Sequence, residues 1–236
     1  MPNKYVDFVS DKDFLECVKW VCEAYPQIND VNEVNMKSLT KNALDPVKMV
    51  FDIFNGEIDF NQWIKNEQIR QADKTVTNRI GEFHQRLLGK VAGWEDLGRG
   101  DPLGIDLKKS DNTIFIELKN KHNTVKGEDQ KHVFDKLKRV SKQNPSSKIY
   151  YAYILPKKPS SGERVWNPSQ RSSKVNILEA WGGRVYEIVT QKSDSLEQVY
   201  KALPIAIATV LQNKRKITRF EKQKLKELFD LSLGTQ

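Results

Sequence analysis

Hydrophobic residues recur at helical spacing through the first part of the chain. Phe14 and Val18 lie on one face of a helix that Ser10 can cap. Similar patterns run from about Glu33 to Phe54, from Phe60 to Gln71 and from Thr77 to Leu88. The pattern therefore predicts a helical N-terminal part over about residues 1–90.

The pattern changes after this helical part. Residues 89–104 are rich in glycine and contain a proline, which predicts a loop. The apolar run Thr113–Lys119 follows Ile105–Leu107 after a short polar turn, and two such runs predict a β-hairpin.

The rest of the chain alternates between strand and helix patterns. The expected elements are a helix over Glu128–Val140, a buried strand over Ile149–Leu155, a loop over 156–174, strands over Val175–Trp181 and Arg184–Thr190 joined by Gly182 and Gly183, and two closing helices, the second beginning with a capping box of Thr218 and Glu221. We expect one α/β domain over 1–236, with a helical part over about 1–90 and a catalytic and DNA-recognition part over about 91–236.

Composition narrows the class of protein. Hydrophobic residues make up 38% and charged residues 30%, which is typical of a folded chain. No apolar run approaches the roughly 18–20 residues that span a bilayer, and the charged N-terminus lacks the apolar core of a signal peptide, so we expect a cytoplasmic protein without a membrane partner. Cys17 and Cys22 fall on different helix faces, a spacing that supports neither a disulfide nor a zinc site.

Charge is distributed unevenly along the chain. The net charge is −5 over residues 1–118 and +13 over residues 119–236, which together give the +8 of the whole chain. A basic half favours binding of a polyanion, while a solvated lysine-rich surface is the alternative. The basic amphipathic segment near the C-terminus is read as a solvated face, with dimer contact or DNA-backbone binding as alternatives.

One group of residues carries candidate chemistry. Side chains alternate along a strand, so Glu117 and Lys119 leave one face while Ile116 and Leu118 leave the other. If Asp106 lies on the neighbouring hairpin strand, its carboxylate lies beside Glu117. Two hard oxygen ligands next to an ammonium group suit a Mg²⁺ ion and a substrate phosphate.

Phosphodiester hydrolysis gives each of these groups a role. Asp106 and Glu117 would hold the metal together with the Leu118 backbone carbonyl, and Lys119 would orient or help deprotonate the attacking water. A lowered pKa is expected for a lysine next to a divalent cation. The spacing of Asp106, Glu117 and Lys119 by itself also fits a hairpin whose charged side chains point into solvent. Because Glu117 and Lys119 interrupt an otherwise apolar strand, a catalytic site is favoured.

The same residues resemble a known superfamily. The pattern Asp106, Glu117, Lys119 resembles that of the PD-(D/E)xK nucleases, although Ile105 replaces the proline. The wider stretch, with IGEFHQ from residue 80, GWEDLG from residue 93 and IELKNK from residue 116, is similar to type II restriction endonucleases that cleave GGNCC.

This resemblance implies further properties. The family implies a restriction-endonuclease-like mixed sheet flanked by helices, Mg²⁺-dependent cleavage of double-stranded DNA, a homodimer, and a cognate DNA methyltransferase as a genetic partner. Many superfamily members carry an acidic residue on an early helix, and Glu82 matches that order. Glu95, Asp96 and Asp101 compete for the role, and Glu82 is equally well read as a solvated carboxylate.

DNA recognition requires donors outside this group, because arginine is the commonest specific partner of guanine. Candidate base readers are Arg164, Gln170, Arg171, Ser172, Ser173, Lys174 and Arg184, and candidate phosphate ligands are Lys121, Lys126, Lys157 and Lys158.

Two other functions compete with a restriction endonuclease. A structure-specific or repair nuclease on the same fold would cut without a fixed sequence. A non-catalytic DNA-binding protein would retain only the basic face.

Overall fold

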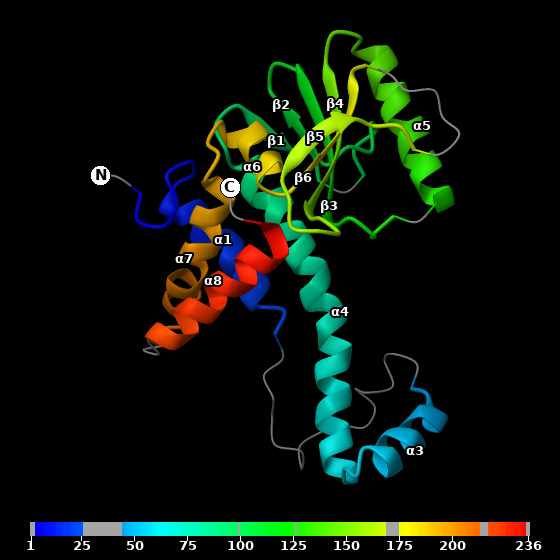
Figure 1. Ribbon diagram of the computed structural model, residues 1–236, viewed down its shortest axis with the longest axis vertical. Helices are drawn as coiled ribbons and strands as arrows, with labels where there is room; N and C mark the ends of the chain where they lie inside the picture. Colours follow the sequence, from blue (N-terminus) through cyan, green and yellow to red (C-terminus); the bar gives the residue numbers. More distant parts are fainter. Residues whose placement is uncertain are drawn as a thin grey trace. The chain divides into compact units, whose positions relative to one another are not determined.

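The computed structural model describes residues 3–25, 44–98, 100–125, 127–168, 175–212 and 217–234. Its helices are α1 (Asp11–Cys22), α3 (Pro46–Asn55), α4 (Phe60–Gly89), α5 (Gly127–Gln143), α6 (Gly183–Thr190), α7 (Ser195–Val210) and α8 (Arg219–Leu233). Its strands are β1 (Trp94–Asp96), β2 (Leu107–Lys109), β3 (Ile114–Lys121), β4 (Lys148–Leu155), β5 (Gly162–Val165) and β6 (Ile177–Trp181) (Figure 1).

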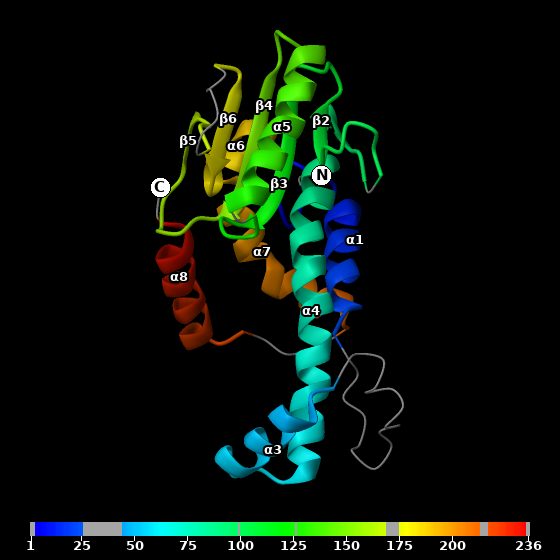
Figure 2. The same ribbon diagram turned by 90° about the vertical axis from the view of Figure 1, so that its right-hand side faces the viewer.

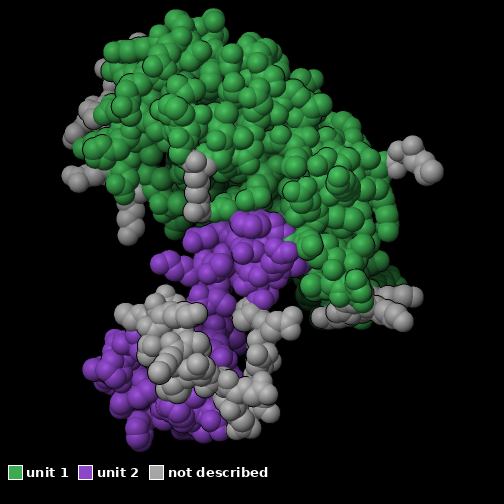
Figure 3. Space-filling model, turned by 180° about the vertical axis from the view of Figure 1, so that it is seen from behind, with its two compact units in different colours: residues 1–19, 81–236 green, residues 20–80 purple. Residues whose placement is uncertain are grey.

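Two compact units divide the chain (Figure 3). The first contains residues 1–19 and 81–236 and includes the whole sheet. The second contains residues 20–80, where Trp63 and Ile64 of α4 form a small core with apolar side chains of α3 and of the segments on either side of α3. The prediction that the whole chain forms one endonuclease domain remains a prediction.

The six strands form one mixed sheet in the order β1-β2-β3-β4-β6-β5. Strands β3, β4 and β6 are parallel, while β1, β2 and β5 pair antiparallel at the two edges. The predicted α/β fold with a mixed sheet, flanking helices and N-terminal helices is therefore confirmed.

The sheet is covered on both faces (Figures 1 and 2). On one face, Phe134 and Leu137 of α5 pack on Phe115, Ile149 and Ile177 of the central strands. Helix α6 lies on the opposite face, where Arg184 of the helix and Tyr150 of β4 both donate to Glu163 of β5. The side chains of the central strands are mostly apolar on both faces, because both faces are covered.

Several predicted elements differ from the structure. The two helices expected over Phe60–Gln71 and Thr77–Leu88 are one helix, α4, because no glycine or proline interrupts residues 72–76. Strand β1 lies inside the loop predicted over 89–104, and β5 inside the loop predicted over 156–174.

The element predicted over Glu33–Phe54 is described only from residue 44 onwards, as α3 and the residues before it.

The prediction of a strand over Arg184–Thr190 was wrong, because these residues form α6. Gly182 has φ 65° and ψ −144°, a conformation essentially restricted to glycine, and the chain turns there from β6 into a helix. Val185, Tyr186 and Val189 are buried at helical spacing. The capping box of Thr218 and Glu221 at the start of α8 is confirmed.

None of the helices within the described ranges is both long and apolar enough to cross a membrane.

Replacing Gly182 by alanine tests the turn between β6 and α6. A Cβ atom at this position would lie 2.5 Å from the Ser160 carbonyl oxygen, in addition to the cost of the positive φ. We expect Gly182→Ala to lower the free energy of unfolding by roughly 2–5 kcal/mol, measured by urea denaturation. Gly93→Ala is the matched control, because φ is also positive there but no atom lies within 4 Å. It should cost about 1 kcal/mol. Equal losses in the two variants would contradict the steric argument.

Candidate active site

Strand β3 carries Glu117 and Lys119 on the face that α5 covers. The side chains of this strand alternate, and Phe115 of the α5 core has the same orientation. Glu117 is only 4% exposed, and Lys119 is partly buried. A buried carboxylate requires charged or hydrogen-bonding partners, so these partners define the site.

Asp106 lies directly before β2 and is held against β3. Its backbone N–H donates to the Ile116 carbonyl over 3.2 Å, which continues the antiparallel pairing of β2 and β3. Its carboxylate accepts a 2.6 Å hydrogen bond from the Leu118 N–H. The Asp106 carboxylate is thereby fixed at the strand that carries Glu117.

Lys119 joins the two carboxylates. Its Nζ atom lies 2.7 Å from Glu117 Oε1 and 3.6 Å from Asp106 Oδ2. The structure thus brings together the three side chains that the sequence identified as the catalytic candidates. Their catalytic roles remain predictions.

Burial and charge shift the pKa values of this group. Burial, and then the charge of Glu117, raise the pKa of Asp106 above its ordinary value, although Lys119 opposes them. Burial acts to lower the pKa of Lys119, but the charges of Asp106 and Glu117 outweigh it and raise this pKa. The pKa of Lys119 is therefore raised, whereas the sequence predicted that it would be lowered. The expected lowering assumed a divalent cation beside the amine, and the charges around it here are two carboxylates.

Lys136 on α5 is a member of the cluster that the sequence reasoning missed. Its Nζ atom lies 2.6 Å from Glu117 Oε2 and donates to the Gly104 carbonyl over 2.6 Å. Each oxygen of the Glu117 carboxylate therefore faces one ammonium group. The only signal in the sequence was a lysine beside the inward-facing Leu137, and such a lysine is usually solvated.

The donor set of the cluster fits a hard divalent cation. Asp106 and Glu117 supply carboxylate oxygens at one point, and such oxygens are the ligands that Mg²⁺ prefers. A cation between them would favour the ionised form of Asp106, which the metal-free surroundings disfavour. Within the described ranges, no group of three or more acidic, histidine or cysteine side chains is placed to hold a metal ion. The role of the Leu118 carbonyl as a third ligand remains a prediction.

Glu82 lies on the C-terminal part of α4, whose neighbouring residues approach β3 and Asp106. The neighbouring Gly81 lies beside Asn120 of β3, and Gln85 donates to the Asp106 carbonyl over 3.5 Å. Among the described residues, however, Glu82 does not form a three-carboxylate group with Asp106 and Glu117. Its catalytic role remains a prediction.

The three acidic residues that compete with Glu82 have structural partners. Asp96 accepts hydrogen bonds from Gln85 and from the Gly98 N–H, Asp101 accepts one from the Leu103 N–H, and Glu95 pairs with Lys108.

The structure describes five of the DNA-binding candidates, namely Lys121, Lys157, Lys158, Arg164 and Arg184. Lys121 is exposed at the end of β3, and Lys157 and Lys158 are exposed after β4. Residues Lys126, Gln170, Arg171, Ser172, Ser173 and Lys174 lie outside the described residues.

Arg164 lies on the same face of the sheet as Glu117. The strand register places Glu117, Tyr151, Glu179 and Arg164 in one row across β3, β4, β6 and β5. Arg164 Nε donates to Glu179 over 2.8 Å, the guanidinium lies 5.5 Å from the centre of the Trp181 ring, and the side chain is 67% exposed.

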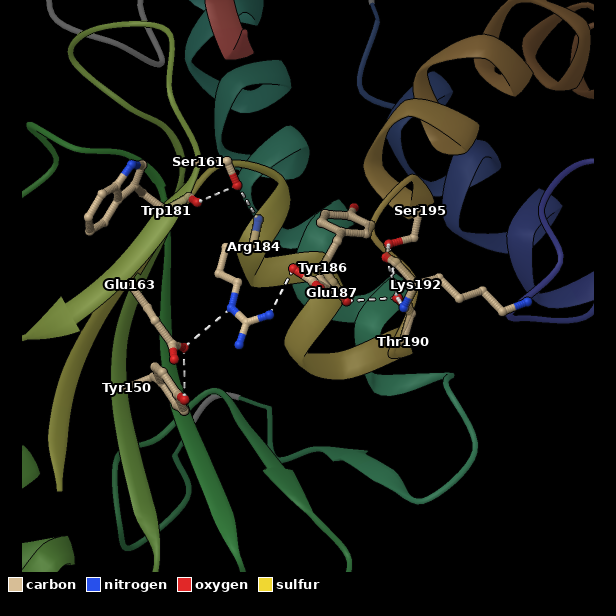
Figure 4. Close-up of polar contacts among 10 residues, drawn as sticks. All are labelled: Tyr150, Ser161, Glu163, Trp181, Arg184, Tyr186, Glu187, Thr190, Lys192 and Ser195. Carbon is tan, nitrogen blue, oxygen red and sulfur yellow. Dashed lines mark hydrogen bonds and ion pairs between the residues drawn. The ribbon is translucent and has the colours of Figure 1, made fainter. Parts of the chain in front are cut away.

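Arg184 lies on the opposite face, beside β4 and β5 (Figure 4). Its guanidinium pairs with Glu187 at 2.8 Å and with Glu163 at 3.4 Å, and Glu163 also accepts a hydrogen bond from Tyr150. Its backbone N–H donates to Ser161 Oγ over 2.7 Å. Arg184 therefore joins α6 to the sheet.

Comparison with known proteins defines the class. A mixed sheet with this acidic and basic cluster matches the architecture expected of a restriction endonuclease. Residues 6–212 match the family model described as Eco47II restriction endonuclease, and the chain therefore belongs to this family.

Two curated relatives are type II restriction enzymes. The chain is 32% identical to Sau96I of Staphylococcus aureus over 91% of its own length and 84% of the relative. It is 33% identical to Eco47II of Escherichia coli over 89% of each chain. The prediction of a type II site-specific deoxyribonuclease, an enzyme that acts on double-stranded DNA, is confirmed.

Asp106→Asn tests the electrostatics of the cluster. The raised pKa means that ionised Asp106 opposes folding once the pH exceeds its ordinary value of 3.8. An asparagine keeps an acceptor for the Leu118 N–H and removes the charge. We therefore expect a higher melting temperature than wild type at pH 7 in EDTA, and no gain below pH 3.8, where the carboxyl group is protonated in both states.

Glu117→Gln is the comparison variant. It removes the negative charge that faces both Lys119 and Lys136, so it should lower the melting temperature at pH 7. A lower melting temperature for Asp106→Asn at pH 7 would show that the Asp106 charge stabilises the fold.

Proposed function

We propose that this enzyme cleaves both strands of DNA at GGNCC in a Mg²⁺-dependent reaction whose site is built from Asp106, Glu117 and Lys119. The observation that carries the proposal is the convergence of two carboxylates and one ammonium group at the β2–β3 hairpin. The Eco47II family membership supports the reaction class.

The chemistry follows from the charges of the site. A divalent cation, when bound, neutralises phosphate charge and lowers the pKa of water at the site. Asp106 and Glu117 would hold the cation, with the Leu118 carbonyl as a further oxygen ligand. Lys119, charged and anchored by Glu117, stabilises negative charge on the phosphate and orients the attacking water. The water oxygen would bond to phosphorus while the bond to the 3′ oxygen breaks. The water gives up one proton and the 3′ oxygen gains one, which leaves 5′-phosphate and 3′-hydroxyl ends.

Recognition of GGNCC requires donors that reach the major groove. Arginine binds guanine through two parallel hydrogen bonds, and GGNCC offers four G·C pairs. Arg164 fits this role because it is exposed and shares a face of the sheet with Glu117. We assign phosphate contacts to Lys121, Lys157 and Lys158.

The biological setting completes the proposal. A twofold-symmetric site is most simply read by a symmetric homodimer. A cognate DNA methyltransferase protects the host, and the enzyme acts in the cytoplasm, where it meets incoming DNA.

Asp106→Ala and Lys119→Ala test the catalytic assignment. Each removes several kcal/mol of charge stabilisation, so we expect plasmid cleavage in Mg²⁺ to fall about a thousandfold or more. DNA binding in Ca²⁺ should be nearly unchanged. Lys109→Ala is the control, because Lys109 belongs to the same hairpin but pairs with Asp111.

Three results would contradict the proposal. Wild-type levels of cleavage by both alanine variants would remove the site assignment. Digestion by the wild type without a fixed banding pattern would indicate a structure-specific nuclease, and binding without any cleavage would indicate a DNA-binding protein.

Arg164→Ala and Arg184→Ala form a matched pair. Arg164→Ala should weaken binding of the folded protein to a GGNCC duplex in Ca²⁺ by about 10- to 100-fold. It should also lower the melting temperature, because it leaves the buried Glu179 without its cationic partner. Arg184→Ala should lower the melting temperature, because Glu163 and Glu187 lose their shared partner, and leave binding by the folded protein nearly intact. If Arg184→Ala weakened DNA binding and Arg164→Ala did not, Arg184 would be the DNA ligand instead of Arg164.

A further inference from the structure

Helix α8 is apolar on two opposite faces. Its inner face carries Leu225, Phe229 and Leu233, and it packs on α7. The rings of Phe229 and Tyr200 are 4.8 Å apart, and the Tyr200 hydroxyl donates to the Leu225 carbonyl over 2.9 Å. This contact accounts for one apolar face of the helix.

The outer face of α8 is both apolar and exposed. Phe220 is 67%, Leu228 56% and Leu231 71% exposed. At 100° per residue, Phe220, Lys224, Glu227 and Leu231 fall within about 60° of one another around the helix. Large apolar side chains grouped in this way are typical of an interaction surface.

A groove adjoins this outer face. It has a volume of about 550 Å³ and is lined by Ile207 of α7 and Leu211 directly after this helix, together with Phe220, Lys224 and Leu228 of α8. Ile207 and Leu211 are themselves exposed. The apolar surface therefore extends from α8 onto α7.

The sequence of α8 is complementary to itself when the helix is reversed. In an antiparallel pair with a twofold axis between residues 225 and 226, Phe220 of one helix lies opposite Leu231 of the other. In the same register Lys224 lies opposite Glu227. Both the apolar and the charged positions of this face are thus matched, as a twofold-symmetric interface requires.

We propose that the outer face of α8 and the adjoining groove dock a second copy of this chain, with the two α8 helices antiparallel. This inference rests on the homodimer of the proposed function and names its surface. A stable interface buries about 800 Å² on each partner, more than one face of a short helix supplies, so Ile207 and Leu211 contribute to it.

Charge reversal tests the register by sedimentation velocity over a range of protein concentrations, without DNA or metal. Lys224→Glu and Glu227→Lys each replace two opposite-charge contacts across the axis by like-charge contacts. Each should raise the dimer dissociation constant about tenfold or more, which is the effect expected from the loss of two exposed ion pairs and their replacement by repulsion.

Mixing the two variants separates contacts between chains from contacts within one helix. Lys224 also pairs with Glu227 of its own helix at 2.7 Å, and both substitutions remove that pair. A mixed dimer nevertheless has opposite charges at both contacts across the axis. The mixture should therefore associate more tightly than either variant alone, which a loss of helix stability alone would not produce.

Lys222→Glu is the control for Lys224→Glu. It makes the same charge change at a position about 160° from Lys224 around the helix, so it should leave the dimer intact. Unchanged dissociation constants for both reversal variants, or no gain on mixing, would overturn the proposed surface. A monomeric wild type would overturn both this surface and the proposed homodimer. The plasmid digest tests the catalytic proposal independently of this surface.

Discussion

The hydrogen bond from the Leu118 N–H to the Asp106 carboxylate is the contact on which the site depends. It joins the residue before β2 to the centre of β3, so the carboxylates from the two arms of one hairpin lie together. Without it, the Asp106 side chain could turn towards solvent and leave Glu117 as the single acidic group. The pairing of β2 and β3 therefore fixes the donor set as well as the fold.

Placing two carboxylates together has an electrostatic cost, and the cluster offsets it with two lysines. Lys119 contacts both acids and Lys136 contacts Glu117 from the other side. The pKa of Asp106 is nevertheless raised, first by burial and then by the charge of Glu117. A site that disfavours its own negative charge has a physical reason to bind a cation, and the cost to stability is expected where binding is the function.

Sequence reasoning succeeded where the deciding geometry is local. Strand alternation alone places Glu117 and Lys119 on one face, and a hairpin needs only a short turn to bring Asp106 to them. It failed at residues 184–190, because a short apolar run fits both periods and the conformation of Gly182 decides between them. Lys136 could not be found, since its contact depends on how α5 packs across the sheet.

Charge counting has a similar limit, which the two arginines illustrate. The basic half of the chain suggested many DNA ligands, but Arg184 is committed to Glu163 and Glu187 and holds α6 to the sheet. Arg164 is also paired, yet its partner Glu179 is buried while the guanidinium side chain remains largely exposed. A buried acid that anchors an exposed arginine restricts its rotamers, which would reduce the entropy lost if Arg164 binds DNA as proposed. The same type of ion pair thus fixes structure in one place and presents a donor in the other, and exposure distinguishes the two.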